Sequence, residues 1–333
     1  MSKTIRLTVS FGLVLISTSS LAQSGVVDST KNANQLALQH WYQANQSALS
    51  NTTTVAPSFP TGNSPIGLAF DGANMWTVNF GDNTVTKLRA KDGSVLGTFA
   101  VGNGPWAAAF DGANIWVTNR SDSTVSKLRA SDGALLGTFA VTGRSPTGIA
   151  FDGANIWVAN FDGNDVTKLR ASDGLLLGTF TVGRKPFGVA IDGSNVWVSN
   201  YRDNTVTKLR GSDGASLGTF PVGVQPEGLA FDGNSIWVAN SGDGSVTILQ
   251  ASNGIELGVL IGGGCCGAAA GLAFDGANIW VTDAISEGEV IKLRASDGAV
   301  LGSFLVGLVP RGIAFDGTKI WVANANGNSV SIL

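Results

Sequence analysis

The sequence predicts a single all-β domain, a seven-bladed β-propeller of four-stranded antiparallel blades. Three observations lead to this prediction. A unit of about 40 residues recurs seven times across residues 55–333. Each copy contains Ala-Phe-Asp-Gly or Ala-Ile-Asp-Gly, with a tryptophan five residues after the aspartate. Each complete copy also contains four short runs rich in Val, Ile, Leu, Phe, Trp and Thr. A repeated unit of this length and strand number is typical of propellers.

The third copy shows the elements of one blade most clearly. Its repeated runs extend from Pro146 to Asn160, from Val166 to Gly174 and from Leu176 to Gly183, and they contain the four expected strands. Asp152-Gly153 and Asp173-Gly174 are tight turns between strands. In the first strand, small residues alternate with large ones, so one face is flat and the other is bulky. Neighbouring blades can then pack bulky face against flat face.

The two ends of the repeat region predict how the ring closes. The chain stops after the third strand of the seventh copy, at Leu333. Residues 58–65 align without a gap to residues 98–105, a fourth strand with its exit loop. We therefore expect the N-terminal strand to complete the last blade and cover its open edge.

The repeat resembles a known family. The unit Pro-x-Gly-x-Ala-Phe-Asp-Gly-x-Asn-Ile-Trp-Val-Ala-Asn is similar to the 40-residue YVTN-type β-propeller repeat, over about residues 55 to 333. This resemblance implies an extracytoplasmic binding scaffold. The chain is more distantly similar in fold to streptogramin (virginiamycin B) lyase, a seven-bladed propeller whose family uses a histidine with acidic and metal-binding groups. Here the one histidine, His40, precedes the propeller.

The first 54 residues differ in kind from the repeats. Residues 1–22 have a basic start, a short apolar stretch and small residues before Gln23, which predicts a signal peptide cut after Ala22 and a secreted or periplasmic protein. Residues 23–54 are expected to form a linker with a short amphipathic helix. Its aromatic stripe is either a packing face or a docking face for a partner. We expect no membrane span in the mature chain, because the uncharged stretch 258–274 is too short and too rich in glycine.

Composition excludes several classes of function. The formal net charge is -3 and the chain has no long basic run, which argues against a nucleic-acid partner. The propeller lacks a Ser/His/Asp set, a zinc-ligand spacing and a phosphate-binding glycine loop. We therefore expect no catalytic residue, no metal and no cofactor.

Differences between copies are the better clue to function, because shared positions maintain the fold. Two loop positions in each copy, after the repeat proline and after the second strand, are expected to ring the channel mouth on one face, the top face. Copies two to four carry aromatic and basic residues there, and copies five and six carry acids, including Asp283, Glu287 and Glu289. The predicted binding residues are Trp106, Arg120, Arg144, Phe161, Arg184, Lys185, Phe187, Tyr201, Arg202, Glu227 and Arg311. Exposed Trp, Tyr and Arg are typical of interaction hot spots, although loop aromatics can also simply pack together.

Four further patterns have structural and functional interpretations. The asparagine that ends each second strand, such as Asn79, is expected to cap its own turn. The Lys-x-Arg pairs, such as Lys87 and Arg89, are expected on a solvated outer face. Asp162 and Asp165 offer too few oxygens for a strong Ca²⁺ site. Cys265 and Cys266 are candidates for a strained vicinal disulfide that contacts a ligand or responds to redox conditions, or for a passive turn.

The sequence thus predicts an extracytoplasmic, non-catalytic binding propeller that engages a protein, peptide or glycan partner through its top face. The alternative is a lyase- or lactonase-type enzyme that uses top-face carboxylates, such as Glu227, and a metal. The fold alone does not decide between the two.

Overall fold

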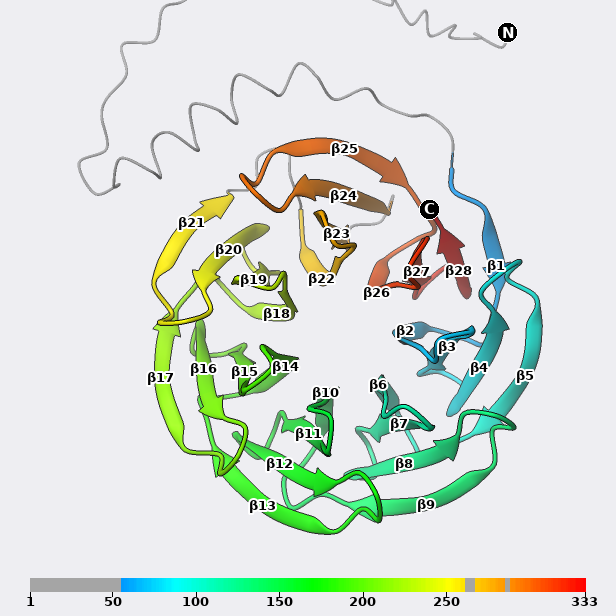
Figure 1. Cartoon of the computed structure of the whole chain (residues 1–333). Helices are drawn as coiled ribbons and strands as arrows, with labels where there is room; N and C mark the ends of the chain where they lie inside the picture. Colours follow the sequence, from blue (N-terminus) through cyan, green and yellow to red (C-terminus); the bar gives the residue numbers. More distant parts are fainter. Residues whose placement is uncertain (1–54, 261–266, 285–287) are drawn as a thin grey trace, which may run out of the picture.

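The computed structural model describes residues 55–260, 267–284 and 288–333. In this part of the chain, seven four-stranded antiparallel sheets form a closed ring around a central channel (Figure 1). The predicted fold class is confirmed. The predicted signal peptide, the linker helix, Cys265, Cys266 and Glu287 lie outside the described residues. Within the described residues, no helix has the length and apolar character needed to cross a membrane.

Blades 1 to 4 follow one another along the chain with almost identical strand lengths. Blade 1 contains β2 (Pro65–Phe70), β3 (Asn74–Asn79), β4 (Thr84–Arg89) and β5 (Val95–Ala100). Blade 2 contains β6 (Pro105–Phe110), β7 (Asn114–Asn119), β8 (Thr124–Arg129) and β9 (Leu135–Ala140). Blade 3 contains β10 (Pro146–Phe151), β11 (Asn155–Asn160), β12 (Asp165–Arg170) and β13 (Leu176–Thr181). Blade 4 contains β14 (Pro186–Ile191), β15 (Asn195–Asn200), β16 (Thr205–Arg210) and β17 (Ser216–Pro221).

Blades 5 to 7 complete the ring. Blade 5 contains β18 (Pro226–Phe231), β19 (Ser235–Asn240), β20 (Ser245–Gln250) and β21 (Glu256–Leu260). Blade 6 contains β22 (Ala269–Phe274), β23 (Asn278–Asp283), β24 (Glu289–Arg294) and β25 (Val300–Leu305). Blade 7 contains β26 (Pro310–Phe315), β27 (Ile320–Asn324), β28 (Ser329–Ile332) and the N-terminal strand β1 (Ser58–Pro60).

The N-terminal strand closes the ring as the sequence predicts. β1 pairs antiparallel with β28, with Phe59 opposite Val330. Two further backbone hydrogen bonds extend the seam: Thr61 donates to Asn328, and Ala56 donates to Leu305 in blade 6. The N-terminal segment therefore joins blade 7 to its neighbour as well as completing it.

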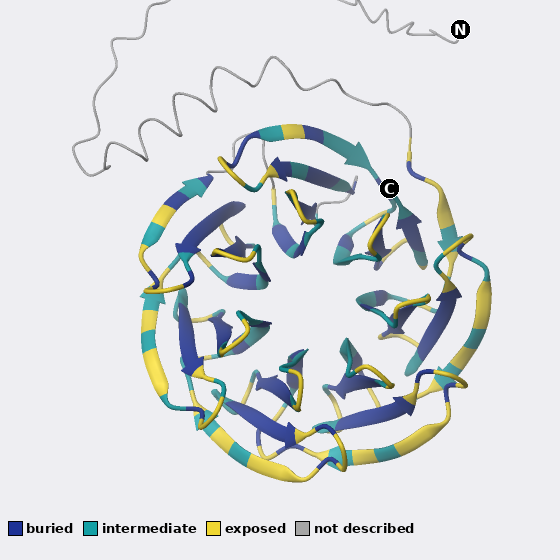
Figure 2. Cartoon of the chain, viewed as in Figure 1, coloured by how far each residue is buried: buried dark blue, intermediate teal, exposed yellow. Residues whose placement is uncertain are grey.

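The first strand of each blade lines the channel, and the fourth strand forms the outer wall (Figure 1). The middle strands are almost entirely buried, whereas outer strands such as β13 alternate between exposed and partly buried residues (Figure 2). Blades approach closely along the inner strands. A Cβ at Gly148 would lie 2.4 Å from the carbonyl oxygen of Phe187 in the next blade. This contact explains why small residues alternate along the first strands.

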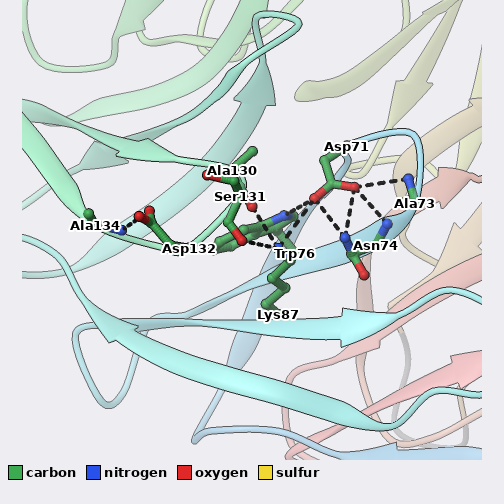
Figure 3. Close-up of polar contacts among 9 residues, drawn as sticks. All are labelled: Asp71, Ala73, Asn74, Trp76, Lys87, Ala130, Ser131, Asp132 and Ala134. Atoms are coloured by element: carbon green, nitrogen blue, oxygen red, sulfur yellow. Dashed lines mark hydrogen bonds and ion pairs between the residues drawn. The ribbon is translucent and has the colours of Figure 1, made fainter.

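The repeated aspartate and tryptophan form one buried unit in each blade. In blade 1, the Nε1–H group of Trp76 donates to the Asp71 carboxylate at 2.8 Å, and the same carboxylate accepts the backbone N–H groups of Ala73 and Asn74 (Figure 3). Burial acts to raise the pKa of Asp71, but these hydrogen bonds outweigh it and hold the pKa below its ordinary value. The aspartates are structural turn residues, as expected.

The lysines of the third strands do not lie on a solvated face, so this expectation was wrong. Lys87 is only 7% exposed. Its ammonium lies 5.1 Å from the centre of the Trp76 ring and donates to the carbonyl oxygens of Ala130 and Ser131 in blade 2 (Figure 3). Only Arg89, the other member of the pair, is exposed. The same hydrogen bonds to the next blade are made by Lys127, Lys168 and Lys208.

Replacing Lys168 with methionine is expected to lower the free energy of unfolding by about 1–3 kcal/mol, because two carbonyl groups of the next blade lose charge-assisted hydrogen bonds from a buried ammonium group. The affected acceptors are Gly211 at 2.7 Å and Ser212 at 3.2 Å. Arg170→Met, on the same strand, is the matched control. Its guanidinium pairs with Asp173 at an exposed site, so the expected change is below about 0.5 kcal/mol. Urea unfolding of both variants measures the difference, and equal effects would contradict this role of Lys168.

Candidate functional site

The top face carries an apolar pocket at the channel mouth. It has a volume of about 160 Å³ and lies where the seven inner strands begin. Its walls are the residues that follow the repeat proline, together with glycine backbone. The side chains that line it are Ile66, Trp106, Ala107, Phe187, Glu227, Ala270 and Arg311. Six of the seven positions after the repeat proline therefore line the pocket, and none of the positions after the second strand does.

Thr147 is the exception among the positions after the repeat proline. Its side chain is fully buried, and its hydroxyl donates to the carbonyl oxygens of Pro186 and Phe187. Thr147 joins blade 3 to blade 4 and does not line the pocket. A hydroxyl group on an inner strand can form its hydrogen bonds with the backbone of the next blade. A comparison of loop residues between copies does not reveal such a contact.

Five rings from blades 1 to 4 form an aromatic cluster on one side of the mouth. The members are Phe80, Trp106, Phe161, Phe187 and Tyr201. Trp106 packs edge-on against Phe80 and Phe187, with ring centres 5.8 Å apart in both pairs. Phe187 stacks on Tyr201, and both contact Phe161. The cluster holds the two rings that line the pocket, Trp106 and Phe187, in fixed positions.

Arg120 is inserted between two rings of this cluster. Its guanidinium lies 4.7 Å from the centre of the Trp106 ring and 4.9 Å from that of Phe161. Desolvation lowers the pKa of Arg120, and the nearby charge of Asp162 partly offsets this effect. Arg120 also lines a second top-face cavity of about 580 Å³. The other residues around this cavity are Phe80, Ser121, Ser123, Arg144, Ser145 and Asp162.

An acidic and a basic residue face each other on the far side of the mouth. The Arg311 guanidinium lies 3.6 Å from the Glu227 carboxylate. Glu227 is only 8% exposed, and burial raises the pKa of its carboxyl group despite the opposing effects of Arg311 and Ser241. The mouth thus has an aromatic side and a side with one ion pair. Of the acids expected there, Glu227 is the one that lines the pocket among the described residues.

The other predicted basic residues lie on the rim and line neither cavity. Arg184 forms a salt bridge with Asp203 at 2.5 Å, and Lys185 pairs with Asp162. The Lys185 ammonium also lies 4.8 Å from the centre of the Phe161 ring. Arg202 is exposed, and its backbone N–H donates to Arg184.

The strand-end asparagines are structural, and Asp283 is not a rim acid. Asn79 is fully buried, and its amide group donates to Thr84 and Thr86. Asp283, which occupies the equivalent place in blade 6, accepts the backbone N–H groups of Gly267 and Ala268. Its carboxylate therefore holds a loop and does not face the mouth as expected.

The two carboxylates of the blade 3 loop bind different partners. Asp162 accepts from Lys185 and Ser145, and Asp165 accepts from Asn160 at 2.6 Å. Among the residues that the structure describes, no three His, Cys, Asp or Glu side chains gather into a metal-binding group.

Sequence reasoning missed the serines of the second cavity and the part Asp162 plays beside Arg120. The spacing of turn residues held a usable signal. Ser123 adopts a left-handed backbone conformation, with φ of 55°, at a loop position where other copies have Asn or Gly. Ser145 does so with φ of 57°, at a position where other copies have Ser, Gly, Lys, Gln or Val. Aligning the copies loop by loop would have placed both residues at the rim.

Comparisons with known proteins support the propeller fold and assign the chain to no family. No family model and no curated protein matches the chain. Among solved structures, hydrazine synthase of Kuenenia stuttgartiensis aligns with a TM-score of 0.72 at 18% identity, over 86% of this chain and 98% of that one. A streptogramin B lyase structure gives 0.70 at 18% identity, over 83% and 96%, and the structure of U3-55K gives 0.71 at 14%, over 84% and 98%. At these identities, the likeness concerns the propeller architecture alone.

Proposed function

We propose that the protein is a non-catalytic binding module that engages a partner through its top face, outside the cytoplasm. A protein or peptide fits best within the predicted set of protein, peptide or glycan partners. The observation that carries the proposal is the apolar pocket at the channel mouth, with Trp106 and Phe187 as its walls. The extracytoplasmic location depends on the signal peptide predicted for residues 1–22.

The size and lining of the pocket suit one apolar side chain. Its volume of about 160 Å³ is close to that of protein cavities of roughly 150 Å³ that bind benzene. Trp106 and Phe187 are held by neighbouring rings, so little side-chain freedom would be lost on binding. Rigid aromatic residues around a small pocket are the usual composition of an interaction hot spot.

Changing Trp106 and Phe187 together to alanine is expected to weaken partner binding by about 30-fold or more, the effect of losing about 2 kcal/mol at a hot spot. The partner is first isolated by affinity capture from the source's envelope and secreted fractions, with residues 23–333 as bait. Calorimetric titration of the purified partner then gives the affinities. The matched control replaces Leu136 and Leu177, two exposed side chains of the outer strands, and should bind like the unchanged protein. Equal binding by both double variants would refute the proposal.

Glu227 favours a second candidate function, an enzyme in which this carboxyl group transfers a proton. A buried carboxyl group with a raised pKa beside a pocket is a common feature of catalytic sites. For this candidate, a screen with lactones should detect turnover that Glu227→Gln abolishes. Partner capture without turnover, retained in the Gln variant, would instead support the binding module.

A further inference from the structure

Four of the top-face loops share a carboxylate contact that the equivalent loop of blade 3 lacks. In four blades, an aspartate of the loop after the second strand accepts the backbone N–H of the residue nineteen positions earlier. The distances are 2.6 Å for Asp82 with Asn63, 2.6 Å for Asp122 with Asn103, 2.7 Å for Asp203 with Arg184, and 2.8 Å for Asp243 with Val224. In these four blades, the aspartate therefore fixes the loop that enters the inner strand.

Blade 4 shows how an arginine uses this contact. Both the backbone N–H and the Nε–H of Arg184 donate to the Asp203 carboxylate, at 2.7 and 2.5 Å. One carboxylate is thus bound by two donors of a single residue. Charge-assisted hydrogen bonds of this kind are among the stronger ones in proteins.

Blade 3 has the arginine without the aspartate. The residue nineteen positions after Arg144 is Gly163, because this loop reads Phe161-Asp162-Gly163 and its acid stands one position earlier. Asp162 donates its own backbone N–H to Arg144 and directs its carboxylate to Lys185 and Ser145. Within the described ranges, neither the backbone N–H nor the guanidinium of Arg144 has a hydrogen-bond acceptor.

A second guanidinium lines the same cavity and is also without an acceptor in the described part of the chain. Arg120 is half-buried between Trp106 and Phe161, desolvation lowers its pKa, and its guanidinium has no hydrogen-bond acceptor among the described residues. Asp162 is the one carboxylate among the residues around this cavity, and Lys185 already neutralises it. Two arginines therefore present unpaired donors to a cavity of about 580 Å³.

From this arrangement we infer that Arg144 and Arg120 bind a carboxylate supplied by the ligand, in the place that Asp203 fills for Arg184. The inference rests on the proposed function and names its ligand class: a peptide segment with an acidic residue close to an apolar one. Trp106 connects the two sites, because its ring lines the apolar pocket and contacts both Arg120 and Phe80 of the second cavity. A peptide is favoured over a sulfated glycan because the adjoining apolar pocket has the size of one apolar side chain.

The test uses blocked heptapeptides that each contain one leucine and one glutamate, separated by zero to three glycines. Each has a counterpart with glutamine in place of glutamate. The expected result is that at least one glutamate peptide binds about tenfold more tightly than its counterpart at low salt, and that Arg144→Gln abolishes this preference. Arg184→Gln is the matched control and should keep the preference, because Asp203 already occupies that arginine. The preference should also weaken as salt rises, since the site is open to solvent.

The outcomes separate the two proposals. Equal binding of glutamate and glutamine peptides, or a preference that survives Arg144→Gln, would overturn the carboxylate site and leave the binding module intact. If no peptide binds, the peptide form of the proposed function fails, and the Nε–H resonance of Arg144 is then followed by NMR during titration with N-acetylglutamate α-amide. A shift absent with N-acetylglutamine amide and absent for Arg184 would still support the carboxylate site, and no shift would refute it. Tighter binding of a heparin-derived oligosaccharide than of any peptide would also overturn the inference.

Discussion

Changing Trp197 to alanine is expected to lower the free energy of unfolding by about 3–5 kcal/mol, the usual cost of removing a buried aromatic side chain. Trp197 is 0% exposed and packs with Ile236 and Leu249 of the next blade. Its Nε1–H group donates to Asp192 at 2.8 Å, and its ring contacts Phe220. The substitution would leave a cavity between two blades and a buried carboxylate without one of its donors.

Trp106→Ala is the matched control for this prediction. Trp106 is partly exposed, and its ring contacts are the aromatic cluster and Arg120, so we expect a loss of only about 1 kcal/mol. Urea unfolding monitored by circular dichroism compares the two variants. A similar loss of stability in both would mean that Trp106 is part of the structural core, which would weaken its assignment to a binding site.

Removing the N-terminal strand is expected to lower the midpoint of thermal unfolding by about 10 °C or more, given that 1 kcal/mol shifts it by about 2–4 °C in domains of this size class. β1 supplies the outer strand of blade 7, and Phe59 packs against residues of blades 1 and 7, including Met75 and Trp321. Without it, β28 would present an unpaired edge, which favours association with another chain.

Calorimetry and size-exclusion chromatography of chains 55–333 and 62–333 test this prediction. Their difference isolates the seven residues that form the seam. The shorter chain should be less stable and should associate at high concentration. If the two chains unfold at the same temperature and both remain monomeric, β1 does not hold the ring closed.

The fold was predictable because its determinants repeat. Each copy contains the Asp-Gly turn and the tryptophan, so the strand pattern of one copy applies to all seven. The alignment of residues 58–65 with 98–105 predicted the closing strand. The role of the lysines was not predictable from the same pattern. Lys168 reaches carbonyl groups 43 and 44 residues further along the chain, and period-two alternation within a strand carries no information about such a contact.

The candidate site was predictable in part. The residues that differ between copies after each proline do surround the channel mouth, except Thr147, whose hydroxyl binds the next blade's backbone. Which arginines form salt bridges could not be predicted from the sequence. Arg144 and Arg184 occupy equivalent loop positions, and only three-dimensional contacts show that Arg184 has a carboxylate partner and Arg144 has none.

The central claim is that a partner binds at the channel mouth, and site-directed photocrosslinking tests it most directly. Benzoylphenylalanine would replace Ile66, which lines the apolar pocket, or Ala154, which lines a cavity of about 590 Å³ at the turns after the first strands, outside the channel mouth. We predict that the captured partner crosslinks from position 66 and not from position 154, and that free peptide carrying a leucine and a glutamate competes with it. Crosslinking from position 154 alone would contradict the account and place binding away from the top-face site.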